Sequence, residues 1–299
     1  CEVFVKLTPS QKEEIVQELR RQGHVVGYMG DGINDATALK AADVGISVDS
    51  AVDVAKEAAD IVLLEKSLLV LEEGIMEGRR IFANIIKYIR MGASSNFGNM
   101  FSVLGASCIL PFLPMKPLQI LTNNLLYDFS QTGIPMDNVD PELVAKPVKW
   151  DINNIKRFMV CIGPISSIFD YATFALMWFF FGASGYLVPA FSAAQKDALA
   201  RLFQTGWFVE SLLTQTLIVH IIRTRRIPFF QSRASAPMIF MTLAVMAIGV
   251  WLPYSPLAPL LGLVPLPGIY WLWIAGFLVF YSMITHRVKR WFLRRFEGV

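Results

Sequence analysis

Charged residues and cysteines are scarce in this chain of 299 residues. Charged side chains make up 17% of it, hydrophobic ones make up 54%, and the mean hydropathy is +0.48. These values are too apolar for an ordinary soluble domain. The three cysteines, Cys1, Cys108 and Cys161, indicate no disulfide framework, and no paired ligand spacing predicts a zinc site. The net charge of +3 comes largely from basic residues at the ends of apolar segments, which favours membrane topology over nucleic-acid binding.

Six apolar segments follow the first quarter of the chain, and each has about the length that a bilayer requires. They lie at about 83–110, 118–135, 158–181, 203–222, 238–252 and 269–284. The loops on one side of these spans carry most of the lysines and arginines. The positive-inside rule therefore predicts a multi-pass protein in contact with membrane lipids, with its N-terminal region and its C-terminus in the cytoplasm.

Residues 1–75 alternate short apolar strands with amphipathic helices, which predicts an α/β fold with a parallel sheet. Strands are expected at 3–5, 25–29, 44–48 and 61–64, and helices after residue 8 and at 34–41 and 52–59. Ligands of such sheets bind at the carboxyl ends of the strands. A helix over 68–87 is expected to continue into the first membrane span.

The loop at 29–36 combines two carboxylates and an amide with two glycines, just after a predicted strand. Asp31 ends the strand and is expected to point toward a ligand, while Gly32 lets the backbone approach a phosphate. Asn34 lies at the first helical turn. Asp35 is near enough to Asp31 to share a Mg²⁺ shell. The structural alternative is an Asx turn that caps the helix.

Polar residues inside the first two spans predict a cation site, because polar groups in a membrane are costly. Asn96 and Asn99 share one helix face, as do Asn124 and Asp128, and a tight hairpin brings the two faces together. The alternative for the asparagines is hydrogen bonding between helices. Glu210, in the fourth span, is a weaker candidate, and a position near the membrane edge explains it equally well.

The runs at 6–12, 29–36 and 38–46 together resemble the second half of a P-type ATPase phosphorylation domain, which is of the haloacid-dehalogenase type. Lys12 taken alone indicates only a solvated helix face. The resemblance implies that Lys12 stabilises the charge on a phosphorylated aspartate and that Asp31 ligates the catalytic Mg²⁺. It also implies that Asn34 and Asp35 order the phosphate and the metal shell.

The runs at 94–100, 121–128 and 221–229 closely resemble bacterial magnesium-transporting P-type ATPases. This resemblance implies ATP-driven uptake of Mg²⁺ across the bacterial inner membrane. Asn96, Asn99, Asn124 and Asp128 fall where such pumps place ion ligands. The implied organisation is a phosphorylation region at 1–75, a stalk helix with the ion-site hairpin at 76–135 and a four-helix membrane region at 136–299.

The family's Asp-Lys-Thr-Gly-Thr and Thr-Gly-Glu motifs do not occur in the sequence. We therefore expect the chain to be the C-terminal part of a longer protein, inactive alone, with ATP bound by a nucleotide domain outside it. A proton or calcium pump of the same class is an alternative, and a lone buried Asp128 would serve equally well as a proton site. A non-catalytic membrane subunit and a membrane-anchored phosphatase are the alternatives from other classes.

Overall fold

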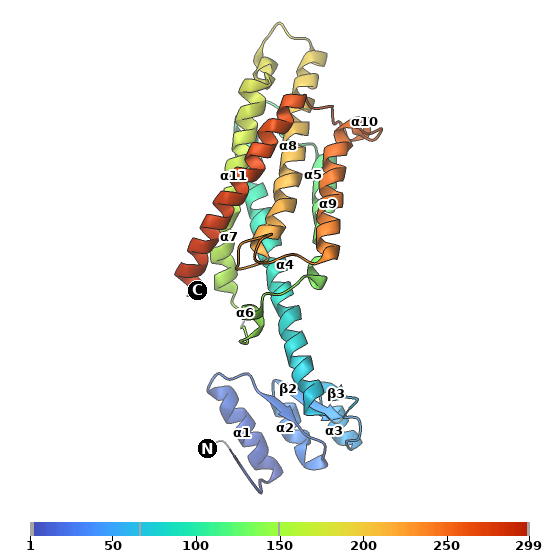
Figure 1. Ribbon diagram of the computed structural model, residues 1–299, viewed down its shortest axis with the longest axis vertical. Coiled ribbons are helices and arrows are strands. Elements are labelled where there is room, and N and C mark those ends of the chain that lie inside the picture. The colour runs from blue at the N-terminus through green and yellow to red at the C-terminus, as the bar shows by residue number, and fades with distance from the viewer. Residues whose placement is uncertain (1–2, 66, 149, 298–299) are drawn as a thin grey trace. The chain divides into compact units, whose positions relative to one another are not determined.

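The computed structural model describes residues 3–65, 67–148 and 150–297. The chain is mostly helical and divides into two compact units, Cys1–Gly78 and Arg79–Val299. Figure 1 shows both units, and each is described by itself below.

The first unit contains, within its described residues, a parallel sheet of three strands in the order β1-β2-β3. The register pairs Tyr28 with Gly45 and Ser47 with Val62. The strands are β1(Gly27–Met29), β2(Val44–Val48) and β3(Ile61–Leu63), and the helices are α1(Pro9–Arg21), η1(Ile33–Asp35), α2(Ala36–Ala41) and α3(Asp53–Ala58). The predicted alternation of strands and helices is therefore present, but the sheet has only three strands among the described residues.

The central strand β2 is largely buried because both of its edges are paired and helices pack against it. Leu39 of α2 and Ala55 of α3 form one core cluster with Val48. The strand expected at 3–5 was wrong: these residues have no regular secondary structure and their side chains are exposed. An apolar run forms a strand only where a neighbouring strand satisfies its backbone groups, and none pairs with this one among the described residues.

The second unit consists mainly of long helices joined by short helical turns. Helix α4(Leu68–Ile109) starts in the first unit and is continuous, as expected of the helix over 68–87 and the span after it. The other helices are α5(Pro117–Gln131), η2(Ile134–Met136), α6(Pro141–Val144), α7(Ile152–Ala175), η3(Leu176–Phe180), η4(Ala183–Leu187), α8(Ala193–Ile222), α9(Ala236–Trp251), η5(Leu252–Tyr254), α10(Ala258–Leu261), α11(Gly268–Phe292) and η6(Leu293–Glu297).

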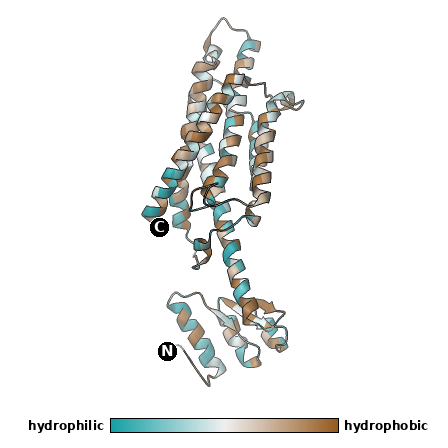
Figure 2. Cartoon of the chain, in the orientation of Figure 1, coloured by the Kyte–Doolittle hydropathy of each residue, from teal (hydrophilic) through white to brown (hydrophobic). Residues whose placement is uncertain are grey.

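Four helical segments in the described part of the chain are long and apolar enough to cross a membrane: Ile152–Phe180, Ala193–Ile222, Ala236–Tyr254 and Gly268–Glu297. Figure 2 shows α9 dominated by hydrophobic residues, and hydrophilic residues gathered at the C-terminal end of α11. The predicted spans at about 83–110 and 118–135 do not meet this criterion of length and apolar character. Helix α5 has only 15 residues, and polar side chains interrupt the apolar character of both α4 and α5.

Helix α8 is the centre of the second unit, between α7 and α11 on one side and α5 and α9 on the other (Figure 1). Its side chains Phe203, Trp207 and Phe208 are buried and join one large apolar core with Tyr270 of α11. Helix α4 approaches α7 closely at Gly98, where an added Cβ would lie 2.6 Å from the Gly163 carbonyl oxygen. Small residues allow such backbone contact between apolar helices.

Buried charges connect the loops at one end of these helices. The Asp137 carboxylate, after α5, accepts hydrogen bonds from Lys87 of α4 at 2.9 Å and from Arg223, after α8, at 2.8 Å. Glu297, in the C-terminal turn, accepts from Arg90 of α4 and from Arg225. These ion pairs hold α4 against the loops that follow α5 and α8.

Candidate functional site

The start of helix α1 sets the position of Lys12 in the first unit. Thr8 caps the helix: its hydroxyl accepts from the Gln11 amide, and the Gln11 side chain accepts from the Thr8 amide. Pro9 occupies the first turn, where its missing N–H costs nothing. The cap fixes where the helix begins, so Lys12 lies one turn inside it and reaches the loop after β1.

Asp35 is the buried centre of this loop and accepts three hydrogen bonds. Its Oδ1 accepts from Lys12 Nζ at 2.7 Å and from the Tyr28 hydroxyl at 2.8 Å. Its Oδ2 accepts from the Gly32 amide at 3.2 Å. The arrangement joins α1, β1 and the loop itself through one carboxylate.

The surroundings of Asp35 decide its charge. Burial opposes ionisation, but the hydrogen bonds from Lys12, Tyr28 and Gly32 outweigh it, so the pKa of Asp35 is lowered. Burial and the hydrogen bond to the Asp35 carboxylate raise the pKa of Tyr28 well above its usual value. Tyr28 is therefore a neutral donor and Asp35 an anion at neutral pH.

Gly30 is required by close packing inside the loop. A Cβ at this position would lie 2.4 Å from the Asp35 Cβ, a distance that no side chain tolerates. The Gly30 carbonyl accepts from the buried Ser47 hydroxyl at 2.9 Å, which fixes the loop to the neighbouring strand β2. The absence of a side chain at residue 30 therefore lets the Asp35 side chain fold back under the loop.

Asp31 and Asn34 are exposed on the same loop, in contrast to Asp35. Asp31 lines a cavity of about 390 Å³ together with Met29, Gly30, Val48, Ser67 and Leu68. This cavity adjoins the carboxyl ends of β1 and β2, where ligands of parallel sheets bind. Of the predicted residues, Asp31 and Asn34 are therefore exposed, whereas Lys12 and Asp35 form an ion pair with each other.

In the second unit, the three asparagines predicted for the cation site line one cavity of about 200 Å³, which we call the asparagine cavity. Asn96 and Asn99 come from α4 and Asn124 from α5, as the hairpin predicted. The remaining lining residues are Met100, Val103, Met115, Ile120, Asn123, Trp207 and Ser211. Helix α8 contributes Trp207 and Ser211, whereas the sequence prediction named only Glu210 of this helix.

Hydrogen bonds hold the walls of the asparagine cavity in place. Gln215 of α8 donates to Asn99 Oδ1 at 3.2 Å and to the Ser211 hydroxyl at 2.5 Å. Asn123 donates to the Phe208 carbonyl at 3.0 Å, while its own buried Oδ1 has no hydrogen-bond partner among the described residues. Asn123 interrupts the same apolar run as Asn124, and that polar interruption was its sequence signal.

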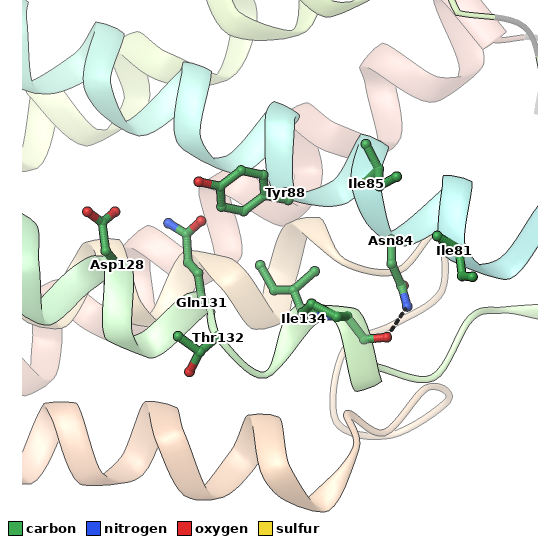
Figure 3. A pocket seen from close by; sticks show the side chains of 9 residues that line it. Ile81, Asn84, Ile85, Tyr88, Asp128, Gln131, Thr132 and Ile134 are labelled. Atoms are coloured by element: carbon green, nitrogen blue, oxygen red, sulfur yellow. Dashed lines mark hydrogen bonds between the residues drawn. The ribbon is translucent and has the colours of Figure 1, made fainter.

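Asp128 lines a different cavity, of about 370 Å³, which we call the Asp128 cavity. Its other lining residues are Ile81, Asn84, Ile85 and Tyr88 of α4 with Gln131, Thr132, Ile134 and Pro135 (Figure 3). The structure therefore places the predicted carboxylate one turn further along α5 than Asn124 and outside the asparagine cavity.

Glu210 does not line either cavity. It is 1% exposed in α8, and its carboxyl group faces Asp170 of α7. Asp170 accepts from the Ser102 hydroxyl at 2.6 Å and from Trp207 Nε1 at 2.7 Å. Sequence reasoning missed Asp170, although a lone carboxylate within an apolar span is itself a signal.

In the described part of the chain, no group of three or more His, Cys, Asp and Glu side chains is placed to hold a metal ion.

The second unit contains long apolar helices and a polar cavity, and the first unit has a small parallel sheet with a glycine-rich acidic loop. The sequence profile described as "Cation transporting ATPase, C-terminus" matches residues 112–291. The chain belongs to this family and is a multi-pass membrane protein.

The more specific similarity is to magnesium transporters. The "Magnesium-transporting ATPase, P-type 1" of Salmonella typhimurium is 60% identical over 294 residues, which are 98% of this chain and 31% of that protein. The protein of that name in Escherichia coli K12 is 58% identical over 98% of this chain. A "Calcium-transporting ATPase" of Bacillus subtilis is 41% identical over 134 residues, or 44% of this chain and 15% of that protein. The chain spans about a third of the length of the magnesium-transporting relatives.

Proposed function

We propose that this chain forms the C-terminal part of an ATP-driven Mg²⁺ transporter that couples formation and hydrolysis of an aspartyl phosphate to Mg²⁺ uptake. The observation that carries the proposal is the identity of 54–60% to magnesium-transporting ATPases across 98% of the chain. The 294 aligned residues extend over both units, so the similarity includes the segments that carry the loop and both cavities.

The first unit is proposed as the second half of a haloacid-dehalogenase-like phosphorylation domain. The Lys12 ammonium, held by Asp35 at the edge of the loop, supplies a fixed positive charge for a phosphoryl group. Asn34, exposed on the same loop, is free of the core and available to donate to phosphate oxygens. The nucleophilic aspartate and the ATP-binding residues belong to the full-length protein.

The catalytic Mg²⁺ fits the donors of this loop. Mg²⁺ takes one or two carboxylates together with phosphate oxygens and waters. Asp31, exposed at the cavity after β1, offers a carboxylate, and Asp35 orders the shell through Gly32. When bound, Mg²⁺ neutralises charge on the transferring phosphoryl group. Asp31 has the role of binding the metal, while Lys12 and Asp35 shape the loop around it.

The transport site is proposed to lie between α4, α5 and α8. Asn96, Asn99 and Asn124 present amide oxygens to the asparagine cavity, and Asp128 supplies a carboxylate one turn away. A single carboxylate among amides suits Mg²⁺ with part of its water shell better than Ca²⁺, which takes six to eight oxygens, often from several carboxylates. Glu210, whose carboxyl faces Asp170, is the weakest member of the predicted set.

All six long helices, α4 and α5 included, are proposed to span the bacterial inner membrane, with the first unit and the C-terminus in the cytoplasm. The polar residues of α4 and α5, which are unfavourable inside a membrane, are then explained by their role in the ion path. Lys289 and Arg290 lie in the last turn of α11, within the hydrophilic end of the helix in Figure 2, as the positive-inside rule requires for that orientation.

Calcium transport is the second candidate, favoured by the similarity to a calcium-transporting ATPase over 44% of the chain. Full-length protein in vesicles, with its cytoplasmic side outward and either ion entrapped, separates the two. Addition of ATP outside should lower luminal Mg²⁺ and leave luminal Ca²⁺ unchanged, and an Asp31→Asn variant should move neither ion. A fall in luminal Ca²⁺ with unchanged luminal Mg²⁺ would identify calcium, not magnesium, as the transported ion.

The isolated chain is proposed to be inactive, because its sequence contains no Asp-Lys-Thr-Gly-Thr motif. Purified chain incubated with γ-labelled ATP should give no acid-stable phosphoprotein, whereas the full-length protein should. Labelling of the isolated chain would show that its own residues supply a phosphorylated aspartate and would support the phosphatase or stand-alone alternatives.

A further inference from the structure

Two separate cavities follow one another along the α4–α5 pair. The asparagine cavity is lined by residues 96–103 of α4, and the Asp128 cavity by residues 81–88 of the same helix. The residues of α5 follow the same order: Asn124 lines the asparagine cavity, and Asp128 and Gln131 line the Asp128 cavity. No residue lines both, so the predicted four-residue cation site is divided between two compartments.

The Asp128 cavity contains buried oxygens that nothing in the described chain satisfies. Gln131 is 4% exposed, and its Oε1 has no hydrogen-bond partner among residues 3–65, 67–148 and 150–297. The same holds for Oδ1 of Asn84, whose amide nitrogen donates to the carbonyls of Pro135 and Asp137. Buried acceptors without donors are unfavourable, so a cation or its water ligands would stabilise both.

The polar groups of this cavity converge. Figure 3 shows the Gln131 amide between the Asp128 carboxylate and the Tyr88 hydroxyl, which come from two different helices. A carboxylate, an amide oxygen and a hydroxyl are the oxygen ligands that Mg²⁺ and Mn²⁺ accept. The other walls, Ile81 and Ile85 of α4 among them, are apolar.

The size of the cavity suits a hydrated ion. Six water molecules occupy roughly 180 Å³ at about 30 Å³ each, and the Asp128 cavity has about 370 Å³. The asparagine cavity, at about 200 Å³, also exceeds this volume, so either cavity has room for a hydrated ion.

We infer that Gln131 and Tyr88 form, with Asp128, a second binding station for a hydrated divalent cation, distinct from the asparagine cavity. The inference rests on the proposed transport of Mg²⁺. In the proposed orientation this station lies on the cytoplasmic side of the asparagines, on the path by which an imported ion is released. Gln131, on α5, binds the ion or its waters, and the Tyr88 hydroxyl, on α4, contributes an oxygen from the other helix.

Binding of Mn²⁺, counted by electron paramagnetic resonance, tests the station directly in the full-length protein. An Asp31→Asn background removes the contribution of the phosphate loop. In that background Gln131→Leu should weaken Mn²⁺ binding roughly tenfold. Gln131→Glu should tighten it, because a second carboxylate joins Asp128. Tyr88→Phe, which removes only the hydroxyl, should weaken binding to a smaller extent.

Thr122→Val is the matched control. Thr122 lies on α5 outside the lining of both cavities, and its hydroxyl donates to the Leu118 carbonyl at 2.8 Å, so the substitution should leave Mn²⁺ affinity unchanged. Equal thermal unfolding midpoints in the four variants would show that binding, not folding, was altered. Tighter binding by Gln131→Glu is a result that a purely structural glutamine would not give.

The outcomes distinguish failure of the station from failure of the transport site. Unchanged affinity in Gln131→Leu and Gln131→Glu, with affinity lost in Asp128→Asn, would overturn the station and leave the proposed function standing. A raised unfolding midpoint in Gln131→Leu with unchanged affinity would assign the cavity to an apolar occupant. Unchanged affinity in Asp128→Asn and Asn99→Ala together would overturn the proposed transport site itself.

Discussion

The Lys12 ammonium donates a 2.7 Å hydrogen bond to Oδ1 of Asp35, across 23 residues of sequence. Asp35 is the more buried partner, and its Oδ2 accepts from the Gly32 amide. The lysine is therefore oriented by the same carboxylate that shapes the loop carrying Asp31. Changing either member of the pair is expected to disturb both the charge and the geometry offered to a phosphoryl group.

The loop is expected to loosen in acid because the pKa of Asp35 is lowered in the folded protein. A lowered pKa contributes stability above the usual Asp value of about 3.9, and this contribution is lost as the pH falls through the folded value. Hydrogen exchange of the backbone amides of residues 29–36, corrected for intrinsic rates, should be slow at pH 7. Protection should decline as the pH falls below about 4.

An Asp35→Asn variant provides the comparison for this pH dependence. Its loop should exchange faster than wild type at pH 7 and should approach the wild-type rate in acid. Glu18→Gln, which alters an exposed ion pair with Arg21, is the control and should not change exchange at 29–36. Equal exchange in wild type and Asp35→Asn at pH 7 would contradict a structural role for the ionised carboxylate.

Gly30→Ala should open the phosphate loop. The new Cβ would lie 2.4 Å from the Asp35 Cβ, so the Asp35 side chain or the backbone must move. Overpacking of this kind costs about 1–3 kcal/mol, which local hydrogen exchange at 29–36 measures. Phosphoenzyme formation by the full-length protein should fall as Lys12 loses its partner.

Gly74→Ala is the matched control for the Gly30 substitution. Gly74 lies in α4 with nothing within 4 Å of an added Cβ, so alanine should stabilise the helix, by up to about 1 kcal/mol. Loss of protection at 29–36 in Gly74→Ala but not in Gly30→Ala would contradict the packing explanation.

Asp137→Asn should destabilise the second unit because Lys87 and Arg223 would remain buried without the carboxylate charge that both of them contact. The Asp137 side chain is fully buried and the Arg223 side chain is 1% exposed. Breaking such a pair costs about 3–5 kcal/mol, measured here as a lower thermal unfolding midpoint of the full-length protein.

The exposed pair of Glu142 and Arg226 offers the control for Asp137. The Arg226 guanidinium lowers the pKa of Glu142, but both groups are in solvent, so Glu142→Gln should change the midpoint little. A midpoint shift in Glu142→Gln as large as in Asp137→Asn would show that the burial of the ion pair is not what matters.

The sequence predicted the elements of the first unit well where local signals agreed. Thr8 and Pro9 marked the start of α1, and the valine-rich run at 44–48 marked the central strand. The strand expected at 3–5 failed because strand formation depends on a neighbour, which no local pattern reveals. The helix over 68–87 was recognised because no proline interrupts it.

The membrane region was less predictable because side-chain direction depends on packing. Helical spacing placed Asn124 and Asp128 on one face, but the structure assigns them to successive cavities. Contacts from α8, such as Gln215 to Asn99, join segments 116 residues apart, and no periodicity in one helix specifies them. Asp170 was missed because it lies in α7, outside the hairpin, and its partners Ser102 and Trp207 come from two other helices.

ATP-driven Mg²⁺ transport by the full-length protein, with and without the asparagine cavity, tests the central claim most directly. An Asn96→Ala, Asn99→Ala double variant removes two amides that line this cavity. In vesicles with the cytoplasmic side outward, ATP should lower luminal Mg²⁺ for wild type and for Thr122→Val. The double variant should require a much higher luminal Mg²⁺ concentration for the same rate. Wild-type transport at every Mg²⁺ concentration in the double variant would contradict the account.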